Sequence, residues 1–279
     1  MPPRAAFIGL GHLGGTLCDH AMRRGVEVSV FDPDPMVVAP RVAAGARPAA
    51  SPADAARDAD AVCVVVRDDS QVLAVVDGTD GVLQGMGPDA VLVLHSTVAP
   101  ATVRAVDERC RRRGVRFVDV AIGAARGRET GEMTAMCGGD EATIAAVTPV
   151  LSTYAKDIVR FGGLGAGMAA KLSRNLIQYS LWAVVHEGAA LADAAGIDRD
   201  AFVELVRTSG VLSEDNAAMR AAGAVSEDAA SRLARTVTLA WKDLDDAFAL
   251  ADEVGMDTPL ARLAKREIGP AVGLALTPD

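Results

Sequence analysis

The run Phe7-Ile8-Gly9-Leu10-Gly11-His12-Leu13-Gly14 lies near the start of the chain and carries the pattern G-x-G-x-x-G. It overlaps an apolar, strand-length segment, residues 5–9, and continues into a helix-like segment. In such a strand–turn–helix unit the first glycine permits a tight turn, the second lets a pyrophosphate approach the backbone, and the third lets helix and strand pack closely. The helix start offers free N–H groups to phosphates. The run therefore predicts a dinucleotide-binding βαβ unit.

Further apolar runs of strand length follow in the first half of the chain, at residues 26–31, 61–66, 90–94 and 116–120. Helix-like or turn-rich sequence follows each of them, and the Val-rich run around Cys63 is typical of a buried parallel strand. Strands that alternate with helices at this spacing predict a doubly wound α/β sheet of the Rossmann type. Strand-like residues 134–137 and 157–160, on either side of a helix expected over residues 140–151, complete the sheet.

After Phe161 the sequence changes to almost wholly helical patterns. A glycine-dense segment, residues 162–167, separates the two halves, and Gly196 is suited to end the long helix that follows. Helices are expected over residues 168–195, 199–209, 213–222, 227–254 and 259–274. We therefore predict an N-terminal Rossmann domain, residues 1–163, and a C-terminal all-helical domain for substrate binding and oligomerisation, residues 164–279. A long interdomain helix joins the two.

The second predicted strand ends at Phe31-Asp32-Pro33. A carboxylate about twenty residues beyond the first glycine accepts hydrogen bonds from the adenosine ribose of NAD and repels the 2′-phosphate of NADP. Since no Arg or Lys follows Asp32 until Arg41, we expect NAD as the cofactor, with NADP disfavoured. The alternative role for Asp32 is the capping of a turn before Pro33.

The composition argues against several classes of function. A formal net charge of -9 does not suit a nucleic-acid-binding protein, which needs a basic surface. No apolar stretch is long enough to cross a membrane, and the N-terminus has no signal-peptide pattern. The four cysteines show no spacing typical of a zinc site or a disulfide framework. We therefore expect no metal, no nucleic-acid or membrane partner, and a reducing, cytoplasmic location.

Lys171 lies in an otherwise apolar part of the long predicted helix. At about 100° per residue, Lys171, Asn175 and Gln178 fall on one narrow face. A helix that is apolar on most sides is buried, so its polar face must meet something polar, and the cleft that holds the nicotinamide is the natural candidate. There Lys171 would act as general acid or base, with its pKa lowered by burial and by the oxidised nicotinamide. Alternatively, Lys171 and Asn175 extend to solvent at the helix edge.

Over almost its whole length the chain resembles the β-hydroxyacid dehydrogenases, a family that includes 3-hydroxyisobutyrate dehydrogenase and tartronate semialdehyde reductase. The glycine run and Val30-Phe31-Asp32 resemble the family's N-terminal signature and second-strand end, and Ser96-Thr97-Val98-Ala99-Pro100 resembles its S-T-x-x-P stretch. The segment Gly165-Ala166-Gly167-Met168-Ala169-Ala170-Lys171-Leu172-Ser173-Arg174-Asn175 resembles the G-x-G-x-x-x-K-x-x-N-N motif that carries the catalytic lysine. Trp241-Lys242-Asp243-Leu244 resembles the late K-D-L motif.

The resemblance implies that Lys171 is the acid/base, that Asn175 orients the substrate, and that Thr97 and Lys242 seat the nicotinamide end. From the residues alone, Thr97 also fits a helix cap before Pro100 and Lys242 a solvated helix charge. The residues expected to bind cofactor are Gly9, Leu10, Gly11, His12, Leu13, Gly14, Phe31, Asp32, Val66, Arg67, Thr97 and Lys242. Those expected to bind substrate are Ser96, Ile122, Gly123, Ala124, Ala125 and Gln178.

The chain departs from the family in the segment Asp119-Val120-Ala121-Ile122-Gly123-Ala124-Ala125. Here the family has approximately D-A-P-V-S-G-G, whose serine and glycine N–H groups grip a carboxylate. Gly123 lacks the serine hydroxyl and its charge-assisted hydrogen bond, and the methyl groups of the next two alanines narrow the approach. Arg126 and Arg128 either replace this grip or are solvated loop charges. We therefore expect a substrate other than the usual small 3-hydroxy acids, bulkier or less acidic.

Together these features predict an NAD-dependent oxidoreductase acting on the CH–OH group of a small hydroxy acid, or on its aldehyde or keto form. Two alternatives use the same fold: an imine reductase-like enzyme, against which Lys171 and Asp32 argue, and a non-catalytic NAD-binding sensor. Arg67, in a region often occupied by proline, and Arg174, in place of the motif's first asparagine, have no assigned role. Since helical second halves in this family pair with other subunits, we expect a homodimer or homotetramer.

Overall fold

The computed structural model describes residues 2–123 and 127–209, and beyond them residues 234, 237–238, 240–241, 244, 248, 251–252, 255–271, 274 and 278. The strands are β1 (Arg4–Ile8), β2 (Glu27–Phe31), β3 (Arg47–Pro48), β4 (Ala61–Val64), β5 (Val91–Leu94), β6 (Arg116–Gly123), β7 (Met133–Gly138) and β8 (Ala155–Gly162). The helices are α1 (His12–Arg23), α2 (Pro35–Ala43), α3 (Pro52–Ala56), α4 (Asp69–Asp77), the short 3-10 helix η1 (Val82–Gln84), α5 (Pro100–Arg113), α6 (Glu141–Leu151), α7 (Ala166–Ala194), α8 (Arg199–Thr208) and α11 (Pro259–Ala271).

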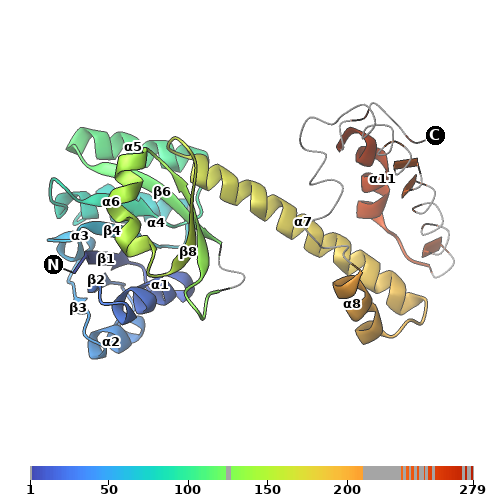
Figure 1. The fold of residues 1–279 in the computed structure, drawn as a ribbon, viewed down its shortest axis with the longest axis horizontal. Coiled ribbons are helices and arrows are strands. Elements are labelled where there is room, and N and C mark those ends of the chain that lie inside the picture. The colour runs from blue at the N-terminus through green and yellow to red at the C-terminus, as the bar shows by residue number, and fades with distance from the viewer. Residues whose placement is uncertain are drawn as a thin grey trace. The chain divides into compact units, whose positions relative to one another are not determined.

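The strands form one sheet in the order β3-β2-β1-β4-β5-β6-β7-β8 (Figure 1). All neighbours are parallel except β6 and β7, which are antiparallel. The strand order reverses direction between β1 and β4, so the connections that follow these two strands run to opposite faces of the sheet and leave a crevice for a ligand at their carboxyl ends. The predicted doubly wound α/β sheet is confirmed.

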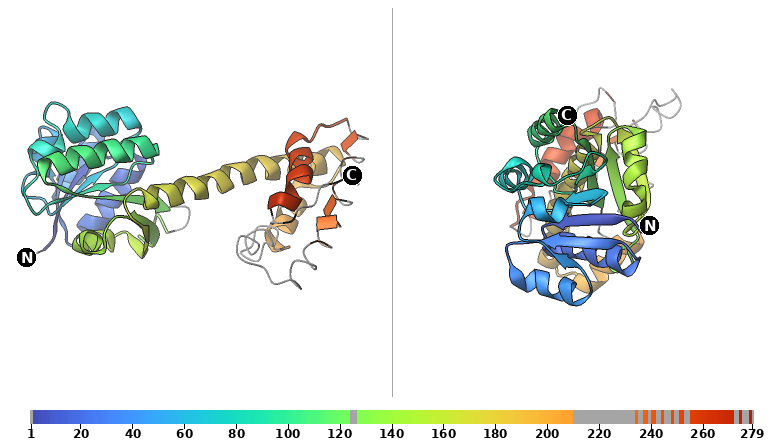
Figure 2. Two further views of the ribbon diagram at one scale, coloured as in Figure 1. Left: turned by 90° about the horizontal axis from the view of Figure 1, so that it is seen from above. Right: turned by 90° about the vertical axis from the view of Figure 1, so that its left-hand side faces the viewer.

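Helices cover both faces of the sheet (Figure 2). Successive residues of a strand point to opposite faces, so each buried strand contributes to two apolar clusters. On one face Phe7 and Val93 pack with Leu17 of α1 and Val147 of α6. The other cluster contains Ile8, Leu94, Val72, Val106 and Met168, contributed by β1, β5, α4, α5 and α7. The Val- and Ala-rich runs read from the sequence are therefore strands buried on both sides.

β6 is longer than the predicted strand, which stopped at Val120. It pairs with β5 only as far as Asp119, opposite Leu94, and then continues beside β7 through Gly123. The short edge strand β3 was not predicted, since two exposed residues carry no hydrophobic periodicity. The other strand and helix predictions within the described residues agree with the structure to within a few residues.

The chain divides into two compact units, residues 1–175 and 176–279, and the boundary between them falls within α7. In the second unit the carboxylate of Glu187 accepts hydrogen bonds from the backbone N–H groups of Leu260 (3.0 Å) and Ala261 (3.1 Å), and so caps the start of α11. The Trp241 indole donates to the Lys265 carbonyl at 2.9 Å. The described elements of this unit are helical, as predicted. The helix expected over residues 213–222 lies outside the described residues, and so does most of the helix expected over residues 227–254.

Among the described helices, none is long and apolar enough to cross a membrane.

Candidate cofactor and catalytic site

The glycine run forms the turn between β1 and α1. Gly9 has a φ of +91°, and a Cβ on it would overlap the Val65 carbonyl. A Cβ on Gly14 would overlap the Gly9 carbonyl, so helix and turn pack too closely for any side chain there. By contrast, nothing lies within 4 Å of a Cβ built on Gly11. The turn is therefore tight at its first and third glycines and open at its second, as a backbone that receives a pyrophosphate requires.

Asp32 lies between the end of β2 and the glycine run. Its Oδ2 accepts a hydrogen bond from the Leu10 N–H at 2.7 Å, and its Oδ1 accepts one from the Asp34 N–H at 2.9 Å. The bond from the Asp34 N–H forms the turn that was the alternative role for Asp32. The bond from the Leu10 N–H ties the carboxylate to the glycine run. Each carboxylate oxygen has a further acceptor position, which would be available to a ribose hydroxyl.

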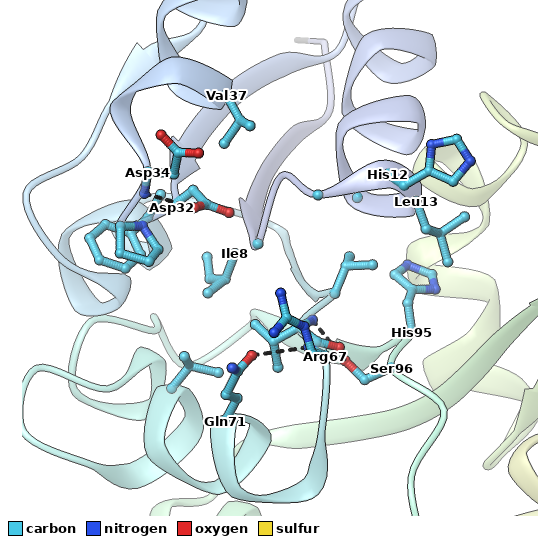
Figure 3. Close-up of a pocket in the computed structure, with 18 of the residues that line it drawn as sticks. Ile8, His12, Leu13, Asp32, Asp34, Val37, Arg67, Gln71, His95 and Ser96 are labelled. Carbon is cyan, nitrogen blue, oxygen red and sulfur yellow. Dashed lines mark hydrogen bonds between the residues drawn. The ribbon is translucent and has the colours of Figure 1, made fainter.

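A cavity of about 840 Å³ opens above these elements (Figure 3). Its lining residues are Ile8, Gly9, Gly11, His12, Leu13, Gly14, Phe31, Asp32, Pro33, Asp34, Val37, Val65, Val66, Arg67, Gln71, Ala74, Val75, His95, Ser96 and Thr97. Most residues expected to bind cofactor thus line one cavity, whereas Leu10 is buried. Sequence reasoning missed nine of the lining residues: Ile8, Pro33, Asp34, Val37, Val65, the α4 residues Gln71, Ala74 and Val75, and His95. The position of α4 directly after a strand of the crevice was a usable signal, but His95 gave none.

Arg67 is the only permanently positive side chain among the lining residues, where Asp32 and Asp34 are negative. Its backbone is held by Gln71, whose Oε1 accepts from the Arg67 N–H at 3.1 Å. Figure 3 shows the Arg67 side chain in the pocket near Ser96 and Gln71. Arg41, the first basic residue after Asp32, is engaged elsewhere, because its Nη2 contacts the Asp19 carboxylate at 2.7 Å.

Ser96 and Thr97 follow β5 and differ in exposure. Ser96 is buried, and its hydroxyl both accepts from the Val66 N–H and donates to the Val66 carbonyl, each at 2.8 Å. The hydroxyl therefore secures the loop between β4 and α4. Thr97 is exposed in the cavity, and Ala99 rather than Thr97 is the cap of α5. The helix-cap alternative for Thr97 is wrong, and its hydroxyl is available to a ligand.

Lys171 and its neighbours form a second group on α7. The Lys171 Nζ donates to the Ile122 carbonyl at 2.7 Å, at the end of β6, where Gly123 follows. Burial, and to a smaller extent the guanidinium of Arg174, lower the pKa of Lys171. Arg174 also donates from Nη1 to the Asn175 Oδ1 at 3.1 Å. Lys171 is thus half-buried, held by a carbonyl and close to a second cation.

Asp119 fixes the start of this helix. Its fully buried carboxylate accepts hydrogen bonds from the backbone N–H groups of Gly165 and Met168, each at 2.6 Å. Burial raises the pKa of Asp119, and these N–H donors oppose that effect. A carboxylate at a helix N-terminus is also favoured by the helix dipole. Asp119 and Ile122 of β6 therefore position both the beginning of α7 and its lysine.

The remaining predicted residues lie elsewhere. Gln178 belongs to the second unit. Ala124, Ala125, Arg126 and Lys242 lie outside the described residues. Arg128 is half-buried, and its carbonyl contacts the buried His20 Nε2 at 2.8 Å.

Known proteins resemble the chain along most of its length. Residues 4–163 match the family described as the NAD binding domain of 6-phosphogluconate dehydrogenase, and residues 165–271 match that described as NAD-binding of NADP-dependent 3-hydroxyisobutyrate dehydrogenase. An uncharacterised oxidoreductase of Mycobacterium tuberculosis is 32% identical over 278 residues, covering 98% of this chain and 94% of that protein. The 3-hydroxyisobutyrate dehydrogenase of Pseudomonas aeruginosa is 30% identical, with 93% of this chain and 89% of that protein covered.

Two solved structures extend the comparison. The 3-hydroxyisobutyrate dehydrogenase of Mycobacterium tuberculosis, in a structure titled with L-serine, has a TM-score of 0.69 at 25% identity, covering 95% of this chain and 92% of that one. An imine reductase from Pseudomonas sp. has a TM-score of 0.78 at 18% identity, covering 98% and 96%. The second likeness concerns the fold alone.

Proposed function

The chain belongs to the β-hydroxyacid dehydrogenase family related to 3-hydroxyisobutyrate dehydrogenase, an NAD(P)-binding group of oxidoreductases, and on this premise we propose its reaction. It transfers a hydride between NAD(H) and the CH–OH carbon of a small hydroxy acid, or its aldehyde or keto form. The observation that carries the proposal is the Lys171 ammonium, half-buried, with a lowered pKa and held 2.7 Å from the Ile122 carbonyl.

Lys171 is the general base in the oxidative direction and the general acid in the reductive one. A neutral amine that donates one N–H to the Ile122 carbonyl still has a lone pair for the proton of a substrate hydroxyl. The bound nicotinamide supplies the acceptor of the hydride that leaves the same carbon. The lowered pKa of Lys171 increases the fraction of neutral amine near neutral pH.

Asn175 orients the substrate oxygen in this proposal. Its Oδ1 accepts from Arg174, so its amide N–H groups are turned toward other acceptors. A substrate hydroxyl or carbonyl oxygen is such an acceptor. Asn175 follows Lys171 by one helical turn, which places the two side chains on the same side of α7.

The cavity supports NAD as the preferred cofactor. The open face of Gly11 suits the pyrophosphate and Asp32 suits the adenosine ribose, while Asp34 adds a second negative charge near the position of a 2′-phosphate. Arg41 cannot balance that charge while it pairs with Asp19. Thr97 is exposed among the lining residues, and its free hydroxyl suits a contact with the nicotinamide end.

The substrate differs from the usual small 3-hydroxy acids of the family. Gly123 ends β6 next to the Ile122 carbonyl that holds Lys171, and it offers no hydroxyl to a substrate carboxylate. This feature supports a bulkier or less acidic hydroxy acid.

A homodimer or homotetramer completes the proposal. In the second unit the part of α7 from Leu176 onward exposes apolar side chains, with 71% of Leu176 and 56% of Ile177 accessible. Such a surface fits a second copy of the chain. Multi-angle light scattering on the purified protein measures the assembly directly, and a monomer at micromolar concentration would contradict this part.

The decisive experiment measures reduction of NAD and NADP across a panel of hydroxy acids, alcohols and hydroxylated amines, with Lys171→Ala in parallel. We expect turnover with NAD on a hydroxy acid other than 3-hydroxyisobutyrate, and a loss of about a thousandfold or more in kcat for the variant. Full activity on 3-hydroxyisobutyrate would refute the substrate proposal. NAD binding without turnover over the whole panel would favour a sensor.

A further inference from the structure

β6 extends past its neighbour, and this leaves an open edge. β5 ends at Leu94 opposite Asp119, whereas β6 continues to Gly123 with β7 alone. Carbonyls two residues apart point to the same edge of a strand. The Val120 and Ile122 carbonyls are such a pair. Each accepts a hydrogen bond from a side chain, where a neighbouring strand would otherwise supply the donor. The His95 Nδ1 contacts the Val120 oxygen at 2.7 Å, and the Lys171 Nζ contacts the Ile122 oxygen at 2.7 Å.

His95 is buried and its protonation is defined by its partners. Burial lowers its pKa to about 4, so the imidazole is neutral near neutral pH. The Val120 carbonyl only accepts, so Nδ1 must carry the proton. The Nε2 atom then accepts from the Tyr154 hydroxyl at 3.1 Å. Both side chains are at most 1% exposed.

We propose that His95 is a positioning residue for Lys171: its Nδ1–H holds the overhanging end of β6, so that the Ile122 carbonyl stays in place to accept from the lysine. The functional meaning rests on the proposed acid/base role of Lys171. His95 also lines the cofactor cavity and directly precedes Ser96 and Thr97. One buried side chain thereby couples the cofactor loop to the strand that holds the lysine.

Two substitutions separate the contacts of His95. An asparagine amide nitrogen takes nearly the place of Nδ1 and keeps the donor to the Val120 carbonyl, while the contact with Tyr154 is lost. The glutamine amide group lies near the place of Nε2, and its oxygen can accept from the Tyr154 hydroxyl, so His95→Gln keeps a partner for Tyr154 and leaves the Val120 carbonyl without its donor. Both variants lose one buried hydrogen bond, so a purely structural role predicts similar effects for the two.

The readout is the titration of Lys171 itself, which needs no substrate. The chain has only four lysines, Lys156, Lys171, Lys242 and Lys265. Reductive methylation with ¹³C-formaldehyde labels each one, and the signal absent from Lys171→Arg identifies Lys171 in NMR spectra recorded against pH. Thermal melts verify that each variant is folded.

We expect His95→Asn to titrate Lys171 as the wild type does. In His95→Gln the lysine gains water as the strand end moves, so its pKa rises toward the ordinary value by about half a pH unit or more. In the active enzyme kcat falls about tenfold in His95→Gln and less than about twofold in His95→Asn. Lys156 and Lys265 are the internal controls.

Equal titration of Lys171 in wild type, His95→Asn and His95→Gln would overturn the proposal, as would equal changes in both variants. If His95→Gln does not fold, Tyr154→Phe replaces it. That variant removes the hydroxyl that donates to the His95 Nε2 and so helps to hold the ring in place, and a Lys171 pKa unchanged in it would count against the proposal. A shifted Lys171 titration without any turnover in the wild type would refute the proposed reaction while leaving the positioning role standing.

Discussion

Arg67 gives the cavity its one permanent positive charge among the lining residues, opposite two carboxylates. The adenosine end of the site repels anions, so the charge of a pyrophosphate must be balanced by the helix start and by Arg67. A proline at position 67 would leave only the start of α1 to balance the charge of the pyrophosphate. Arginine at this position therefore changes the electrostatics of cofactor binding. It does not change the conformation of the loop, because Ser96 and Gln71 hold that loop through its backbone groups.

Arg67→Gln is expected to weaken NAD binding about tenfold, because one charge-assisted hydrogen bond is lost. Arg104→Gln, which removes an exposed arginine from α5, is the matched control and should leave affinity unchanged. Isothermal titration with NAD, ADP and adenosine measures the effect. Loss for NAD and ADP but not adenosine identifies a phosphate contact. An equal loss for adenosine would mean that Arg67 contacts the base or ribose instead.

At the scale of the elements, the glycines of the turn between β1 and α1 serve two different purposes, helix packing and cofactor binding. Gly14 is needed for packing, since a Cβ there overlaps the Gly9 carbonyl, while Gly11 faces open space. We expect Gly14→Ala to lower the free energy of unfolding by about 2 kcal/mol or more through overpacking. Gly11→Ala should cost about 1 kcal/mol or less, as a change of cap residue, and still reduce NAD affinity at least about tenfold. Urea unfolding with NAD titration tests both, and equal stability of the two variants would contradict this assignment.

The junction of β6 and α7 depends on Asp119. Asp119→Ala leaves the Gly165 and Met168 N–H groups without their acceptor, and we expect the free energy of unfolding to fall by about 2–4 kcal/mol. Asp119→Asn keeps one acceptor and relieves the burial of a charge that raises the pKa of Asp119, so its cost should be smaller. Urea titrations of both variants at neutral pH measure the difference. A larger loss for asparagine than for alanine would show that the carboxylate does not cap the helix.

For the whole molecule, the buried side chain of His95 makes the free energy of unfolding depend on pH. Its pKa falls from 6.5 to about 4 on folding, so between these values the unfolded chain binds more protons than the folded one. Stability from this group is complete above pH 6.5 and is lost as the pH falls toward 4, by about 3 kcal/mol in total. Asp119 acts in the opposite sense, because its raised pKa makes the folded state bind a proton more readily.

The comparison of wild type with His95→Asn isolates this contribution, since the other titrating groups are shared. Free energies of unfolding measured in urea at several pH values from 7 to 4.5 should converge as the pH falls. A constant difference between the two proteins over that range would show that the pKa of His95 is the same in the folded and the unfolded chain.

The sequence alone determined the order of strands and helices and the place of the glycine turn, because these depend on local periodicity and on the steric needs of single glycines. Asp32 and Lys171 were also selected as candidates in this way, one by its spacing and one as a charge in an apolar helix. The functional interpretation of Lys171 needed more, since periodicity equally allowed a solvated lysine.

Only the tertiary structure decided which groups hold these residues. Neither His95 beside Val120 nor Asp119 beneath α7 has a local signature, because each contact joins segments far apart in the chain. The two hydrogen bonds between the Ser96 hydroxyl and the Val66 backbone likewise have no local signature. The extension of β6 beyond β5 likewise depends on β7, which follows later in the sequence. Hydrogen bonds between distant segments are set by packing, and packing is a property of the folded chain rather than of any stretch within it.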